Sequence, residues 1–125
     1  MTIQEALDTA DRMKPNMMDT GLKISFLNEI EGKVHEEIIM THWHSPAEAV
    51  RPEYDTGTDP GTNLIMPAPY DRFYVFWIMM KIDLLNQEAD KYNNEAALFD
   101  QEYRSMQDWW NRKRVPLPRL RELRI

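Results

Sequence analysis

The segment from Tyr70 to Asn86 constrains the fold more than any other part of the sequence. Twelve of its 17 residues are apolar or aromatic, and it contains no proline or glycine. It is too long for a typical strand, so the pattern predicts a helix, with Pro69 at the position where a first helical turn accepts proline. A helix that is apolar around almost its whole circumference must be buried on most sides. We therefore expect a central helix whose outer face also meets another subunit.

Two amphipathic helices are predicted before this segment. Thr2 and Glu5 have the spacing of a capping box, and the first helix ends before Pro15. A second start signal lies at Asp19, and apolar residues then recur every three or four positions to about Thr41. The apolar faces consist of Ile3, Ala6, Leu7, Ala10 and Met13, followed by Ile24, Leu27, Ile30 or Glu31, Val34 and Ile38.

A fourth helix is predicted from about Gln87 to Arg112. Its apolar residues step by three and four positions, as in a heptad seam, and Pro116 and Pro118 follow its end. Trp109 lies off this seam, so we expect it either to pack on the basic tail beside Arg112 or Arg114, or to meet a partner. The seam consists of Tyr92, Ala96, Phe99, Tyr103, Met106 and Trp110.

A long connection separates the second and third predicted helices. Residues 43–67 contain four of the eight prolines and two of the four glycines, with four acidic residues and one basic residue. A connection of this length is usually functional or mobile. Asn63 to Met66 suit a short strand, half of a possible β-hairpin. The predicted fold is therefore all-α: a small bundle of about four helices, a long protruding loop and an extended C-terminal arm.

Charge divides the chain into two parts. Residues 1–111 hold nine Lys and Arg against twenty Asp and Glu, a net charge of −11, whereas residues 112–125 carry +5. The acidic part repels nucleic acid and the basic part attracts an acidic partner, although a solvated tail that aids solubility is the plainer alternative. We predict a helical domain over residues 1–112 and a basic arm over 113–125.

Composition argues against several other classes of protein. The chain has no cysteine, so disulfide scaffolds, thiolate metal sites and cysteine nucleophiles are excluded. Its longest apolar run, Phe73 to Met80, is far shorter than the roughly 20 residues of a membrane span, and acidic residues occupy the start, where a signal peptide is basic. We expect a soluble, non-secreted protein without cofactors.

Catalytic motifs are missing from the sequence. His35 and Glu36 resemble the start of a zinc-protease helix, but position 39 is Ile39 rather than histidine. A metal site on His42 and His44 remains a minor alternative, and its test is elemental analysis. Glycine is too scarce for a phosphate-binding loop, and no serine has the context of a nucleophile. We therefore predict that the protein is not an enzyme.

An ordered series of short motifs resembles the small head–tail connector proteins, also called adaptor or head-completion proteins, of tailed phages and prophages of Gram-positive bacteria. The similarity spans roughly residues 1 to 112. The motifs are Leu64-Ile-Met-Pro-Ala-Pro-Tyr-Asp71, Phe73-Tyr74, Ile82-Asp83, Tyr92-Asn93-Asn94, Phe99, Tyr103 and Trp109-Trp110-Asn111-Arg112.

This resemblance implies a non-catalytic virion protein of the neck, assembled in the bacterial cytoplasm. About twelve copies would form a ring beneath the portal protein, extend the DNA channel and present a surface to the next neck or tail-completion protein. Genomic DNA would pass through the acidic ring without specific binding, because cationic walls would retain phosphates. A ring of this kind reuses one pair of heterologous patches around the circle.

Three sets of residues are the candidate sites within that interpretation. The portal-docking arm consists of Arg112, Lys113, Arg114, Leu117, Arg119, Leu120, Arg121, Leu123 and Arg124. Core and subunit contacts are assigned to Tyr70, Phe73, Tyr74, Trp77, Tyr92, Phe99, Tyr103, Trp109 and Trp110. The loop that faces the lumen or a neighbour carries Trp43, Glu48, Glu53, Asp55 and Asp59.

The main alternative is a small helical nucleic-acid-binding regulator that uses the basic tail. Its signature would be duplex binding that weakens steeply with salt. The acidic body and the lack of a helix-turn-helix pattern count against it.

Overall fold

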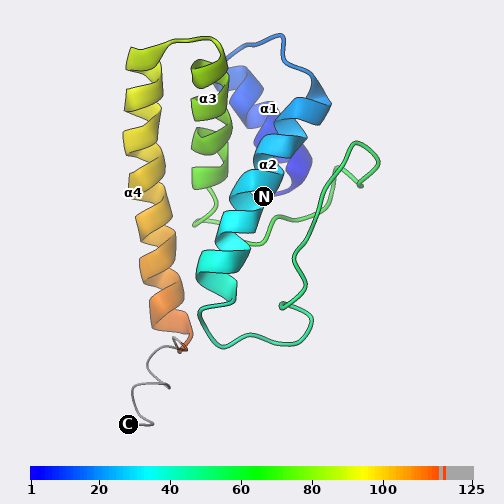
Figure 1. Ribbon diagram of the computed structural model, residues 1–125, viewed down its shortest axis with the longest axis vertical. Coiled ribbons are helices and arrows are strands. Elements are labelled where there is room, and N and C mark those ends of the chain that lie inside the picture. The colour runs from blue at the N-terminus through cyan, green and yellow to red at the C-terminus, as the bar shows by residue number, and fades with distance from the viewer. Residues whose placement is uncertain (116, 118–125) are drawn as a thin grey trace.

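Four α-helices and one short π-helix make up the described part of the fold (Figure 1). The computed structural model describes residues 1–115 and 117. The elements are α1 (Ile3–Met13), α2 (Thr20–Val34), η1 (His35–Ile39), α3 (Phe73–Leu85) and α4 (Ala89–Lys113). The described residues form no β-strand. The predicted all-α bundle of about four helices, with its long loop between the second and third, is confirmed.

The apolar helix α3 lies at the centre of the bundle. It packs against α1, α2 and α4 (Figure 1), and eight of its thirteen residues are buried. The half-buried Trp77 donates its indole N–H to the Phe26 carbonyl of α2 at 2.9 Å. The predicted central helix is confirmed, whereas its contact with a second subunit stays a prediction. Within the described residues, no helix is both long and apolar enough to cross a membrane.

The start of α3 differs from the sequence expectation. Pro69 follows a cis peptide bond, and the Tyr70 N–H donates to the Pro67 carbonyl at 2.9 Å. A cis proline at the third position of a four-residue turn reverses the chain. Pro69 and Tyr70 therefore lie in a turn ahead of α3, and the helix begins at Phe73 instead of Tyr70.

The predicted seam of α4 is confirmed as a packing face. Phe99, Tyr103, Met106 and Trp110 are buried, and Tyr92 and Ala96 pack partly buried beside them. The Phe73 ring of α3 meets the Tyr103 ring edge-on, with centroids 5.3 Å apart and planes at 89°. Edge-to-face geometry of this kind stabilises a pair beyond its buried area.

The long loop packs against the bundle over much of its length. It runs beside α2 and returns to α3 (Figure 1), and it buries Tyr54, Leu64 and Met66. The Pro60 and Thr62 carbonyls each accept an N–H of the first turn of α1, at 3.0 Å. These N–H groups have no partner within the helix, so the loop caps α1. A hairpin does not form, and Asn63 makes an isolated antiparallel bridge with Thr2.

Glu31 of α2 anchors both halves of this loop. Its fully buried carboxylate accepts hydrogen bonds from the Tyr54 hydroxyl at 2.7 Å, from the Ile65 N–H at 2.9 Å and from the Tyr74 hydroxyl. Burial raises the pKa of Glu31, and the two tyrosine hydrogen bonds oppose that change. A buried carboxylate with this many donors fixes the loop to α2 and α3 at once.

Candidate functional site at the lower end of the bundle

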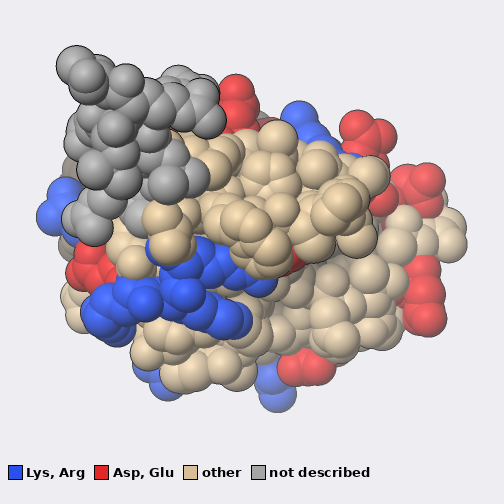
Figure 2. All heavy atoms as spheres, turned by 90° about the horizontal axis from the view of Figure 1, so that it is seen from below, with Lys and Arg blue, Asp and Glu red and all other residues tan. Residues whose placement is uncertain are grey.

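Three segments distant in the sequence meet where α4 ends, which we call the lower end. They are residues 41–50, residues 67–72 and the last turns of α4. Seen from below, this end carries a group of Lys and Arg side chains, with acidic side chains toward the edges of the view (Figure 2). The predicted arm begins here. The candidate residues that come together at this end are Trp43, Glu48, Tyr70, Trp109, Trp110, Lys113 and Arg114.

Trp109 is held by an aromatic partner and a lysine. Its ring stacks on Tyr70, with centroids 4.5 Å apart and planes at 11°. The Lys113 ammonium lies 4.9 Å from the Trp109 centroid and 5.4 Å from that of Trp110. The expectation that Arg112 or Arg114 covers Trp109 is therefore wrong: Lys113 lies one helical turn after Trp109 and reaches its face, whereas Arg112 is exposed.

Arg114 joins α4 to the start of the long loop. Its guanidinium lies 4.4 Å from the Trp110 centroid and 5.7 Å from that of Trp43, and it donates to Glu48 at 2.8 Å and to the Trp43 carbonyl at 3.2 Å. The Arg114 hydrogen bond, aided by the Ser45 N–H, lowers the pKa of Glu48 to about 2. The side chain assigned to portal docking is thus engaged within its own subunit.

The arm starts with backbone pairing to the segment after η1. The Trp43 N–H donates to the Val115 carbonyl at 2.9 Å, and the Leu117 N–H donates to the Thr41 carbonyl at 2.8 Å. These two bonds fix the point at which the arm leaves the bundle. The other assigned arm residues, Arg119, Leu120, Arg121, Leu123 and Arg124, lie outside the described residues.

The histidines have structural partners. His42 is buried, with Nδ1 2.7 Å from the Ile38 carbonyl and Nε2 2.6 Å from Oδ1 of Asn111. His44 Nδ1 lies 2.8 Å from the His42 carbonyl. Over residues 1–115 and 117, no group of three or more histidines and acids is arranged to hold a metal ion. The contacts therefore favour a structural role for His42, which ties η1 to α4.

The loop residues assigned to a lumen or a neighbour have different environments. Trp43 is 60% exposed, and Glu53, Asp55 and Asp59 are also exposed. The Asp55 and Asp59 carboxylates each accept the N–H of the glycine two residues later, which shapes the turns of the loop. Glu48 instead faces Arg114, so Trp43 is the large apolar side chain that this loop presents at the lower end.

The residues assigned to core and subunit contacts divide into two groups. One group is buried in the core and the other is half-buried and keeps some surface. The buried group is Phe73, Tyr74, Phe99, Tyr103 and Trp110, and the half-buried group is Tyr70, Trp77, Tyr92 and Trp109. Tyr70 and Trp109 stack on each other at the lower end and keep part of their surfaces exposed.

Sequence reasoning missed two buried acids, Asp83 and Glu95, and the Lys14 side chain that pairs with both. Glu31 is also buried, at the step of the second helix where the spacing allows either Ile30 or Glu31 on the inner face. Asp83 left a signal, since it is the one acid within the apolar run of α3. Glu95 left none, because its place in α4 resembles that of the exposed acids around it.

Comparison of the chain with protein-family models, with curated proteins and with solved structures finds no match. We therefore infer function from the contacts, the charge distribution and the motifs given above. Exposed tryptophan, stacked aromatic rings and arginine are the side chains that protein–protein interfaces favour. The lower end is suited to binding another protein.

Proposed function

We propose that this protein is a structural adaptor subunit of the head–tail connector of a tailed phage. In this role it binds the portal protein through its lower end and arm, forms a ring with further copies of itself and bridges to the next neck or tail-completion protein. It carries out no catalysis. Its place is the neck of the virion, after assembly in the bacterial cytoplasm.

One observation carries this proposal: the lower end combines an exposed Trp43 with the point where the basic arm leaves the bundle. The backbone bonds at Val115 and Leu117 attach that arm to residues 41–43, next to the Tyr70–Trp109 stack. A partner with acidic residues around an apolar pocket would meet tryptophan in the centre and arginine at the rim. Aromatic anchors inside a charged rim are typical of stable interfaces.

The acidic body supports the ring model in a second way. Residues 1–111 carry a net charge of −11, and Glu53, Asp55 and Asp59 of the loop are exposed. DNA that slides through a channel must not be retained by cations on its wall. The half-buried Phe76 and Trp77 of α3 leave apolar surface for a neighbouring copy.

The test is native mass spectrometry with negative-stain imaging of the full chain mixed with the portal protein of the same genome. We expect a portal ring that gains about one copy per portal subunit, with new density at its narrow end. The arm is tested by deletion of residues 118–125, which leaves the backbone bonds of Val115 and Leu117 in place. Binding should be lost and helical content kept.

Charge-matched variants separate the arm from net charge. Arg119→Glu, Arg121→Glu and Arg124→Glu together should abolish portal binding, whereas Arg12→Glu, Lys91→Glu and Arg104→Glu together, which change the net charge equally, should preserve it. No association with portal at any salt concentration would overturn the proposal. Tight, salt-sensitive duplex DNA binding in that case would establish the nucleic-acid-binding alternative.

A further inference from the structure

A buried cluster of one lysine and two acids joins three helices at the end opposite the candidate site, which we call the upper end. Lys14 follows α1, Asp83 lies in the last turns of α3, and Glu95 lies in the second turn of α4. Asp83 is fully buried and Glu95 is 8% exposed. The Lys14 ammonium contacts Oε1 of Glu95 at 2.6 Å and also Oδ1 of Asp83.

The second oxygen of each acid lacks a conventional donor. Among the described residues, the buried atoms Asp83 Oδ2 and Glu95 Oε2 have no hydrogen-bond partner, although both acids contact the same Lys14 ammonium. One ammonium cannot neutralise two buried carboxylates, and two ionised carboxylates have no proton to offer each other. A single proton on one acid supplies a donor for the other and makes the cluster neutral around Lys14.

We propose that Glu95 holds this proton in mildly acid solution and releases it in mildly alkaline solution, so that the cluster is a proton-dependent latch between α4 and the rest of the upper end. With the proton, Glu95 donates to Asp83. Without it, the two carboxylates repel, and Glu95 turns away from Asp83 toward solvent. Lys14 stays paired with Asp83, so α1 and α3 remain joined while α4 loses its tie.

The surroundings of Glu95 allow this movement. A groove of about 390 Å³ lies beside it, lined by Lys14, Glu88 and Lys91 among others. The ionisable groups around it come from every neighbouring element: Lys14 after α1, Asp83 of α3, Glu88 between α3 and α4, and Lys91 of α4. Lys91 gives the ionised carboxylate a cation on the solvent side of the groove.

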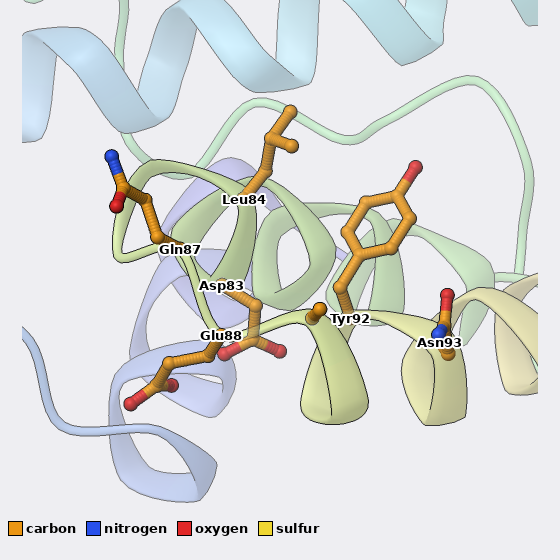
Figure 3. Close-up of a pocket in the computed structure, with 7 residues that line it drawn as sticks. Asp83, Leu84, Gln87, Glu88, Tyr92 and Asn93 are labelled. Atoms are coloured by element: carbon orange, nitrogen blue, oxygen red, sulfur yellow. The ribbon is translucent and has the colours of Figure 1, made fainter.

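Asp83 cannot follow the same route. Figure 3 shows its carboxylate on the side of Glu88, while the neighbouring Leu84 points away from it. The cavity there, of about 320 Å³, is lined by Asp83, Glu88 and Tyr92 and holds no lysine or arginine. The electrostatics agree with this division of roles. Burial, followed by the neighbouring Asp83 carboxyl, raises the pKa of Glu95 to about 7, whereas the Glu95 carboxyl and the Lys14 ammonium together outweigh burial and lower the pKa of Asp83.

The test measures the proton and the movement separately, in the full chain. The ¹³C shift of the Glu95 side-chain carboxyl should titrate with a midpoint near 7. Amide hydrogen exchange of residues 89–96, corrected for intrinsic pH dependence, should rise at least fivefold between pH 6 and pH 8.5. In Glu95→Gln, whose amide donates to Asp83 at every pH, protection of the same amides should stay constant.

Glu102→Gln is the matched control, because it changes the same residue type in the same helix outside the cluster. It should keep the wild-type transition. A Glu95 midpoint near 4.5, or an equal loss of protection in Glu95→Gln and wild type, would overturn the proposal. The wild-type titration decides the matter even if Glu95→Gln folds poorly. The latch does not depend on the proposed adaptor function.

Discussion

The two ends of the bundle are both held together by charged side chains, but in opposite environments. At the upper end, Lys14 lies between two buried carboxylates, of which Asp83 has no exposed side-chain surface. At the lower end, Arg114 and Lys113 lie over tryptophan rings, and the Arg114–Glu48 pair keeps 18% and 32% of its side-chain surfaces exposed. Removal of one member of a buried charge cluster leaves the other charges unpaired and costs much stability. A half-exposed cation over an aromatic ring contributes less, because water can replace part of its contact.

The stability of the two ends also changes with pH in opposite directions. The pKa of Glu95 is raised to about 7, so the folded state binds more protons and the upper end loses stability as pH rises from about 4.5 to about 7. The pKa of Glu48 is lowered to about 2, so the lower end loses stability as pH falls from about 4.5 to about 2. A rise in pH toward 7 therefore weakens the upper end, whereas the lower end is weakened only in acid solution.

The largest effect is expected at the upper end. Lys14→Met keeps the length of the side chain but leaves Asp83 and Glu95 without their cation. Breaking a buried ion pair from one side costs about 3 kcal/mol of unfolding free energy, measured as the shift of the urea transition at pH 7. Because the two acids can then take up protons, the loss should be smaller at pH 5.

Lys91→Met is the control for this prediction. Lys91 pairs with Glu88 on the surface, with 63% of its side chain exposed, so its removal should change the unfolding free energy by under about 0.5 kcal/mol. Equal effects of the two variants would mean that the upper end is solvated, and the contrast between the ends would then disappear.

A smaller effect is expected for the corresponding change at the lower end. Arg114→Met removes the hydrogen bonds to Glu48 and to the Trp43 carbonyl but keeps an apolar side chain near Trp110. We expect a loss of about 1 kcal/mol in urea denaturation, since the pair is partly solvated. The pKa of Glu48, followed by its carboxyl ¹³C shift, should return toward 4.5. A loss as large as that of Lys14→Met would show that the lower end is as rigid as the upper.

The helices could be predicted from the sequence because local patterns determine them. The apolar run of α3, the three- and four-residue steps of α4 and the Thr2 capping box each depend on residues a few positions apart. The Thr2 hydroxyl does accept the Glu5 N–H, at 3.1 Å. The predicted start of α3 was wrong because the sequence does not show whether the Ala68–Pro69 peptide bond is cis or trans.

The candidate site could be predicted only in part, for a similar reason. The tryptophans and the basic residues were evident, but Lys113 over Trp109 and Arg114 on Glu48 depend on how residues 41–50 return to the end of α4. The anchoring of the long loop was also missed. Glu31 accepts hydrogen bonds from Tyr54 and Ile65, more than twenty residues away. The helical spacing allows Glu31 on the inner face of α2, but no local pattern shows which loop residues will bond to it.

A third prediction concerns the acid side of the stability profile. Glu48→Gln removes the carboxylate whose pKa Arg114 lowers to about 2. Wild type should lose stability between pH 4.5 and pH 2 more steeply than the variant, by under about 1 kcal/mol because the pair is partly exposed. Urea midpoints across that range measure the difference. Identical slopes in the two proteins would show that Arg114 does not hold Glu48 in solution.

The smallest effect on stability is expected for substitution of Trp43. The same substitution is the strongest test of the lower end as a binding surface. With 60% of its surface exposed and the Arg114 guanidinium 5.7 Å from its ring centroid, Trp43→Ala should change the unfolding free energy by under about 0.5 kcal/mol. If the adaptor proposal is correct, affinity for the portal ring should still fall at least tenfold, because a tryptophan anchor at an interface contributes well over 1 kcal/mol. Met17→Ala, at a fully exposed apolar side chain in the turn between α1 and α2, should leave both quantities unchanged. A Trp43→Ala variant that binds portal like wild type would place the interface elsewhere on the bundle. A variant that unfolds would mean that the fold of the lower end depends on Trp43.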